Sequence, residues 1–130
     1  MWVLDTNTLI YFFKGQGRVP ERLLSHSPLE IGIPAIVLYE LEVGVAKSST
    51  PRKRSAQLQQ LASVTQLLPF GSAEAKASAE VRATLKKGGR PIGPYDVLIA
   101  GTALAAGAKL VTRNTREFNR IKGLQLEDWF

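Results

Sequence analysis

The stretch Val3-Leu4-Asp5-Thr6-Asn7 decides the fold prediction for this chain. It closes an apolar run from Met1 to Leu4 that predicts a short buried strand, with an aspartate where the strand ends. Open α/β sheets bind their ligands at the edge formed by the carboxyl ends of the strands. The same residues are also typical of a turn or a helix N-cap, because short oxygen-bearing side chains accept hydrogen bonds from free backbone N–H groups. Both interpretations of Asp5 stay open until other carboxylates can be brought to it.

The composition predicts one globular domain over residues 1–130. The apolar fraction is 45% and the charged fraction 22%, as in ordinary soluble proteins. No run approaches the roughly 18 apolar residues of a membrane span, and no basic leader precedes the first strand, so we expect a cytoplasmic protein. The absence of cysteine excludes disulfides, thiolate metal sites and cysteine nucleophiles. The one histidine, His26, lies in a turn-like stretch and is expected on the surface, which makes zinc chemistry and histidine catalysis poor interpretations.

Positive charge is in excess and unevenly distributed. Seventeen Lys and Arg residues against eleven Asp and Glu give a net charge of +6. A polyanion such as nucleic acid is the natural partner of such a surface, although basic surfaces also serve solubility. The basic residues form three groups: Lys47, Arg52, Lys53 and Arg54; Arg82, Lys86, Lys87 and Arg90; and Lys109, Arg113, Arg116, Arg120 and Lys122.

Segments with strand patterns and segments with helical spacing alternate along the chain. This alternation predicts an α/β domain with a parallel sheet and right-handed crossovers. The expected strands are 1–4, 29–33, 66–68, 109–112 and 124–126. The expected helices follow Asp5, open at Pro20, run from Pro34 to about Lys47, surround Leu58 and Leu61, and cover 72–85, 97–106 and 115–120.

Two acidic positions on these helices are ambiguous. Glu40 and Glu42 lie about 200° apart around one helix, so only one of them can face a given site. Gly44, one turn beyond Glu40, would leave space beside it, but the spacing does not choose between the two. Asp96 stands in the N-terminal turn of a helix rich in small residues, where a carboxylate is favoured by free N–H groups and the helix dipole. Asp96 is therefore either a cap or a site residue.

The topology allows several acidic and amide side chains to share one edge of the sheet. Carboxylates that lie close together repel and raise one another's pKa, and a hard divalent cation relieves that repulsion. Such an ion acidifies a bound water, and a carboxylate can orient that water for attack on a phosphodiester. The candidate residues are Asp5, Asp96, Asn114 and either Glu40 or Glu117.

Four motifs in order make the chain resemble a PIN-domain ribonuclease, and more narrowly the VapC toxins of bacterial toxin–antitoxin pairs. The resemblance covers essentially the whole chain, including the ending Leu126-Glu127-Asp128-Trp129. The motifs are Val3 to Asn7; Val37 to Leu41 with Gly44; Gly93-Pro94-Tyr95-Asp96 with Ile99-Ala100; and Val111 to Phe118. The resemblance implies a three-layer α/β fold in which helices flank a central, mostly parallel sheet of four to five strands.

The resemblance further implies a Mg2+- or Mn2+-dependent endoribonuclease. Asp5, Glu40 and Asp96 match the acidic residues of the family, which favours Glu40 over Glu42. Many PIN domains have a fourth acid where this chain has Asn114, so Asn114 serves through its oxygen, Glu117 replaces it, or three carboxylates suffice. Thr6 and Thr112 are expected to hold ligands or water in place.

The family also implies particular partners. These are a VapB-like antitoxin that inserts a segment into the site, a homodimer with two acidic sites along a basic groove, and a larger assembly on DNA through the antitoxin. The implied substrates are structured RNAs, and the likeness of residues 93–96 to the enteric type favours the anticodon region of initiator tRNA. Proteins read RNA bases mostly in single-stranded loops.

Two other functions compete with this interpretation. The amide at Asn114 keeps open a catalytically weak or inactive PIN relative that only binds RNA or antitoxin. A phosphotransfer domain with Asp5 as nucleophile is the other alternative. Its haloacid-dehalogenase form expects a second aspartate where this chain has Asn7, and its receiver form expects the phosphorylated aspartate after a later strand.

Overall fold

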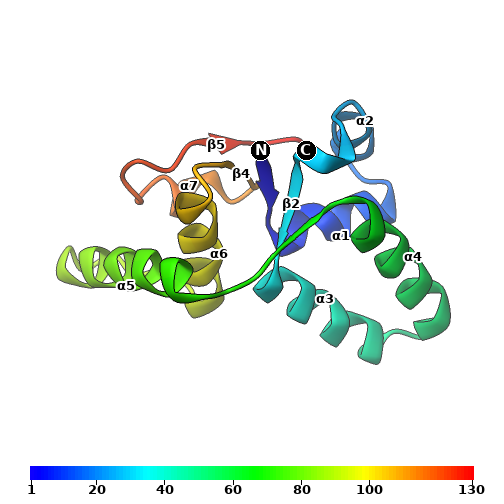
Figure 1. Ribbon diagram of the computed structural model, residues 1–130, viewed down its shortest axis with the longest axis horizontal. Helices are drawn as coiled ribbons and strands as arrows, with labels where there is room; N and C mark the ends of the chain where they lie inside the picture. The colour runs from blue at the N-terminus through cyan, green and yellow to red at the C-terminus, as the bar shows by residue number, and fades with distance from the viewer.

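The computed structural model describes residues 1–130 and contains a five-stranded parallel sheet (Figure 1). The spatial order is β3-β2-β1-β4-β5, and every neighbouring pair is parallel. The strands are β1 (Trp2–Leu4), β2 (Ile31–Pro34), β3 (Gln66–Leu68), β4 (Lys109–Val111) and β5 (Leu126–Glu127). Strand β1 is therefore central, and Asp5 leaves the sheet in the middle of its carboxyl edge. The predicted α/β class and strand number are confirmed.

Helices flank the sheet. Helices α5 and α6 lie on one side, and α1, α2 and α4 lie on the other, while α3 continues from the end of β2 (Figure 1). The helices are α1 (Thr6–Lys14), α2 (Val19–Leu24), α3 (Ala35–Lys47), α4 (Pro51–Val64), α5 (Ser72–Lys87), α6 (Pro94–Ala105) and α7 (Thr115–Phe118), with a 3-10 turn at Pro28–Glu30. None of them is both long and apolar enough to cross a bilayer.

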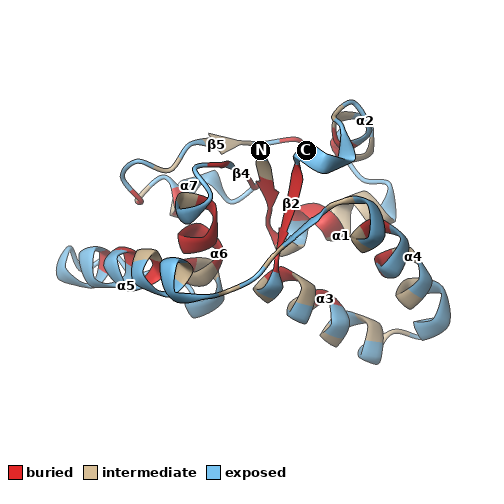
Figure 2. Cartoon of the chain, viewed as in Figure 1, coloured by how far each residue is buried: buried red, intermediate tan, exposed pale blue.

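The core lies around the three central strands, which Figure 2 shows as largely buried. Val3 and Leu4 of β1, Ile33 of β2, and Leu110 and Val111 of β4 are completely shielded from solvent. A parallel sheet covered on both faces needs such continuous apolar strands rather than an alternating pattern. This core fixes the strand ends, and therefore the residues that follow them, in space.

Helix α6 approaches its neighbour α5 unusually closely. A side chain at Gly101 would collide with Ser78, because an added Cβ would overlap the Ser78 Oγ and lie 2.8 Å from its Cα. The small residues of α6 thus permit close backbone contact with α5. The contact fixes α6, the helix that carries Asp96 in its first turn, against α5.

Several element boundaries differ from the predictions. Pro34 was expected to open α3 but is the last residue of β2 and the N-cap of the helix, because its extended backbone at ψ 145° still pairs with Leu68. Leu29 was expected in the second strand but lies in the 3-10 turn. Helix α6 begins at Pro94 instead of Val97, since Pro94 suits a first helical position. The last strand is shifted to Leu126–Glu127 by its pairing with Leu110 and Val111.

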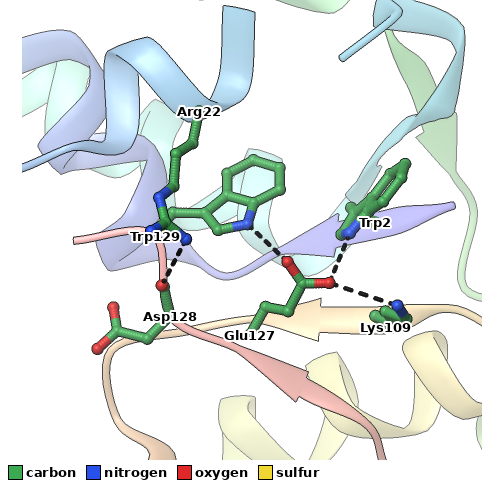
Figure 3. A network of polar contacts seen from close by, with 6 residues as sticks. All are labelled: Trp2, Arg22, Lys109, Glu127, Asp128 and Trp129. Atoms are coloured by element: carbon green, nitrogen blue, oxygen red, sulfur yellow. Dashed lines mark hydrogen bonds and ion pairs between the residues drawn. The ribbon is translucent and has the colours of Figure 1, made fainter. Parts of the chain in front are cut away.

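A polar network ties the carboxyl-terminal segment to the sheet (Figure 3). The indole N–H groups of Trp2 and Trp129 donate to the two carboxylate oxygens of Glu127, at 3.0 Å and 3.1 Å. The ammonium group of Lys109 lies 3.5 Å from the same carboxylate. These partners, with the Trp2 bond first, hold the pKa of Glu127 below its usual value. Glu127 thus links β1, β4 and the final residues.

The expected surface position of His26 is wrong. Its ring is half-buried between Trp2 and Trp129, with ring centroids 4.0 Å and 5.0 Å away, and it stacks on Trp129 at an interplanar angle of 13°. Trp2 opens β1, whereas Asp5 follows the end of that strand. His26 is therefore a packing residue at the opposite end of β1 from the acidic edge.

Candidate active site

Asp5 lies at the carboxyl end of β1 and is held by two hydrogen bonds. It is 5% exposed. Its Oδ1 accepts the backbone N–H of Thr8 at 2.9 Å, and its Oδ2 accepts the hydroxyl of Thr112 at 2.6 Å. Burial raises the pKa of Asp5, and the hydrogen bonds from Thr112 and Thr8 oppose that rise. Asp5 is thus both the N-cap of α1 and a fixed carboxylate at the sheet edge, so the two interpretations of this residue are compatible.

Asp96 lies in the first turn of α6 but does not cap it. The N-cap is Gly93, and no side chain makes a capping hydrogen bond there. The pKa of Asp96 is raised to about 6. Burial is the largest cause, and the negative charges of Asp5, Glu117 and Glu40 add to it. The structure therefore brings four carboxylates within electrostatic reach of one another, with Asp96 among them.

Glu40, and not Glu42, faces this acidic group. The Thr6 hydroxyl donates to Glu40 Oε1 at 2.8 Å, which links the first turn of α1 to α3. Glu42 is exposed and adds no charge to Asp96. The spacing along the helix did not distinguish Glu40 from Glu42. The side of α3 on which α1 packs distinguishes them. Thr6 and Thr112 each donate a hydrogen bond to one acidic side chain.

The fourth acidic group is Glu117. It is half-buried on α7 and acts on Asp96, whereas the Asn114 side chain is exposed and makes no hydrogen bond. The backbone N–H of Asn114 donates to Thr112 Oγ1 at 3.0 Å. Asn114 therefore supports Thr112 through its backbone, and the structure does not bring its amide into the acidic group.

The side chains of the candidate site are suited to bind a hydrated divalent cation. All of its ligating atoms are oxygens, which Mg2+ and Mn2+ prefer. No three acidic side chains are close enough to enclose an ion by themselves. Mg2+ commonly binds through one or two carboxylates and completes its shell with water and substrate phosphate. The residues present therefore fit an open, water-rich metal site and do not fit a closed one.

Three residues beside the acids were given no role by the sequence. Thr8 is buried, and in addition to its bond to Asp5 its hydroxyl donates to Val111 O at 3.2 Å. Its position three residues after Asp5 is the spacing of an N-cap bond, which could have revealed it. Tyr39 and Tyr95 precede Glu40 and Asp96, and their ring centroids lie 5.8 Å apart. Contact with the Tyr39 phenol, more than the charge of Glu40, raises the pKa of Tyr95.

A parallel α/β sheet with carboxylates gathered at its carboxyl edge supplies the oxygen donors that a metal-dependent nuclease needs. The sequence profile described as "PIN domain" matches residues 2–124. The tRNA(fMet)-specific endonuclease VapC of Shigella flexneri is 36% identical over 128 residues, which cover 98% of this chain and 97% of the relative. Ribonuclease VapC2 of Rickettsia felis is 34% identical, covering 99% and 98%. The chain belongs to the PIN-domain family, among the VapC ribonucleases.

Solved structures lead to the same family. The DNA-bound VapBC complex of Salmonella typhimurium contains a chain with a TM-score of 0.92 and 37% identity, covering 99% of this chain and 98% of that one. VapBC2 of Rickettsia felis, bound to a DNA fragment from its promoter, gives a TM-score of 0.91 with 34% identity and the same coverage. The predicted resemblance is confirmed. Nucleases of the PIN family generally depend on a divalent metal ion.

Proposed function

We propose that this protein is the toxin of a VapBC-type toxin–antitoxin pair and cleaves RNA with Mg2+ or Mn2+. The observation that carries the proposal is the gathering of Asp5, Glu40 and Glu117 around Asp96, whose pKa is raised to about 6 by burial first and then by the charges of these three carboxylates. Carboxylates forced together in this way are arranged for a cation that neutralises them. The family membership supplies the reaction, and a cytoplasmic location follows from the proposed RNA substrate.

Each acidic residue has a role in this proposal. Asp5, Glu40 and Asp96 would hold the metal ion, which when bound acidifies water and offsets the charge of the scissile phosphate. The hydrogen bonds from Thr112 and Thr8 fix the direction of the Asp5 carboxylate. Glu117, half-buried beside Asp96, is the carboxylate that orients the attacking water and takes its proton.

The substrate we propose is structured RNA, with the anticodon region of initiator tRNA as the first choice. Two relatives at 36% identity, from Shigella flexneri and Salmonella typhimurium, are named tRNA(fMet)-specific endonucleases. The basic surface supports a nucleic acid ligand, since only Arg18 and Lys109 among the Lys and Arg side chains pair with a carboxylate. No salt bridge neutralises the charge of the other cations, so that charge can attract phosphate.

The partners we propose follow the similar complexes. A VapB-like antitoxin would mask the acidic edge, and two toxin chains would form a homodimer. The Salmonella typhimurium and Rickettsia felis complexes are bound to DNA, so we expect a toxin–antitoxin assembly on DNA through the antitoxin. The alternative, an inactive RNA-binding relative, is not favoured, because Glu117 supplies the fourth carboxylate that Asn114 lacks.

Cleavage of purified tRNAs tests the function. The wild-type chain should cut initiator tRNA within the anticodon loop in Mg2+ or Mn2+ and leave it intact in EDTA. Asp5→Asn and Asp96→Asn should lose the activity, because each removes a proposed ligand, while Glu42→Gln on the exposed side of α3 should keep it.

Sequencing the new RNA ends would identify the target and the cleavage position. RNA binding without metal-dependent cutting would instead support the inactive relative. Cleavage that persists in both aspartate variants would reject the proposed site.

A further inference from the structure

We propose that Tyr39 and Tyr95 form a stacking site for an unpaired base of the RNA substrate, next to the phosphate that is cut. The inference rests on the proposed ribonuclease function and extends it to how the substrate is held. In this proposal the two rings bind a nucleobase of the RNA. None of the residues described above has that role.

The geometry brings the two rings together from separate elements. Tyr39 lies on α3 and Tyr95 in the first turn of α6, and their rings meet edge to face at an interplanar angle of 76°. Tyr39 is 52% exposed and Tyr95 is 44% exposed. Each ring keeps an open surface although it contacts the other ring, so the pair forms a platform that the chain itself does not cover.

The two rings lie beside the proposed catalytic residues. Tyr39 directly precedes Glu40, and Tyr95 directly precedes Asp96. An RNA strand whose phosphate reaches these carboxylates has a base attached on each side of that phosphate. A base that turns out of the strand at this point would meet the uncharged surface of the two tyrosine rings. The acidic group, in contrast, would repel any further phosphate of the strand.

A nucleobase is the ligand that these properties favour. Aromatic side chains stack on unpaired bases, and this contact tolerates different sequences because every base has a π-face. Two phenol rings are too small a patch for a stable protein interface, which buries about 800 Å² per partner. The position beside the acidic edge, instead of on a broad apolar face, also points to a substrate contact.

Binding of a fluorescent RNA tests the proposal without requiring cleavage. The probe is an RNA hairpin with 2-aminopurine at one loop position at a time, mixed with the full chain in EDTA. At one loop position the emission should be quenched on binding to the wild-type chain, because the base stacks on tyrosine. Tyr39→Ala and Tyr95→Ala should remove the quench and weaken binding about 5- to 150-fold.

Conservative variants and a distant control separate stacking from a general effect on folding. Tyr39→Phe and Tyr95→Phe should keep both quench and affinity, because the ring remains. Leu29→Ala removes an exposed apolar side chain, 67% exposed, from the 3-10 turn that precedes β2, and should change neither. Thermal unfolding of each variant checks that the fold is intact.

Three results would overturn the stacking site. These are alanine variants that bind as tightly as the wild type, a quench that survives in them, or a change of oligomeric state on size-exclusion chromatography, which would place the pair in a protein interface. Metal-dependent cleavage by the wild type alongside any of these results would leave the ribonuclease intact. A chain that never cleaves RNA but shows the quench would reject the nuclease, and with it the position of the base next to a cut phosphate, while the stacking contact itself would stand.

Discussion

Asp5 is the most constrained of the four carboxylates at the candidate site. Its two oxygens accept from Thr8 N–H and the Thr112 hydroxyl, and its own backbone N–H donates to Val111 O at 3.1 Å. The carboxylate is therefore oriented before any ligand arrives, and a preorganised ligand costs less reorganisation on binding. Asp96 is half-buried, and burial followed by the neighbouring carboxylates raises its pKa to about 6.

Thr112→Val should weaken the site without altering its acidic residues. The substitution removes the hydroxyl that donates to Asp5 and accepts from the Asn114 N–H. Loss of such a supporting contact typically costs 10- to 100-fold in metal affinity or activity, so we expect cleavage to fall by about that factor. Thr65→Val is the control, because its hydroxyl donates to Leu61 O at 2.8 Å at the end of α4, where Thr65 is the C-cap. Equal cleavage rates for the two variants would contradict the role of Thr112.

Asp96→Asn should stabilise the metal-free chain at high pH. The pKa of Asp96 is about 6 in the folded chain and ordinarily 3.8. Between these values the folded chain retains a proton that the unfolded chain has released. The free energy of unfolding therefore falls as the pH rises from about 4 to about 6, and the loss persists above that range.

Urea unfolding in EDTA at pH 5 and pH 8 measures this effect. Since Asp96 is half-exposed and screened by water, we expect Asp96→Asn to be more stable than the wild type by about 1 kcal/mol at pH 8, and by less at pH 5. Added Mg2+ should stabilise the wild type more than the variant. An Asp96→Asn variant less stable than the wild type at pH 8 in EDTA would show that the carboxylates do not repel.

At the scale of elements, the contact between α5 and α6 holds the turn that carries Asp96. Gly101→Ala should destabilise the fold by about 2 kcal/mol, because the new methyl group overlaps Ser78 and the helices must separate. Gly44→Ala is the control in the middle of α3, where an added Cβ meets no atom within 4 Å. It should be neutral or stabilising by about 1 kcal/mol, since alanine favours helix. Denaturant unfolding of both variants measures the two changes in stability. Equal stabilities would show that close packing against Ser78 is not what requires glycine at position 101.

The elements themselves follow from local sequence, and their ends depend on neighbours. Apolar runs and helical spacing predicted all the strands and the long helices. The end of β2 at Pro34 could not be predicted, because it depends on pairing with Leu68 of β3. The shift of β5 toward Glu127 likewise depends on β4. Local patterns determine that an element forms, whereas pairing across the sheet determines where it stops.

The candidate site could be predicted only in part for a similar reason. Asp5 was identified from the strand that precedes it, whereas Thr112 was expected as a supporting residue only through the family resemblance, because it lies 107 residues away along the chain. The choice of Glu40 over Glu42 came from the family resemblance, and in the structure it depends on Thr6 of α1. The misplacement of His26 arose because one of the two rings that cover it belongs to Trp129, near the other end of the sequence.

At the scale of the whole molecule, the positive charge should make RNA binding strongly dependent on salt. Each phosphate contact that a Lys or Arg makes contributes about one unit to the slope of log affinity against log salt. Arg116 is exposed on α7 beside Glu117, so Arg116→Ala should weaken RNA binding and reduce this slope by about one. Lys76→Ala on the exposed surface of α5 is the control. Filter binding over a range of KCl concentrations tests this, and identical slopes for the two variants would place the RNA elsewhere.

The aromatic cluster around Glu127 also provides a spectroscopic tool. The chain has two tryptophans, and both donate to Glu127 in the segment that closes the fold. Trp2 begins the strand that Asp5 ends, so indole emission reports unfolding at a distance of about 10 Å along β1 from the acidic edge. Labelled RNA reports the acidic edge itself. Loss of fold and loss of ligand can therefore be followed at separate wavelengths in a single titration, without attaching a dye to the protein.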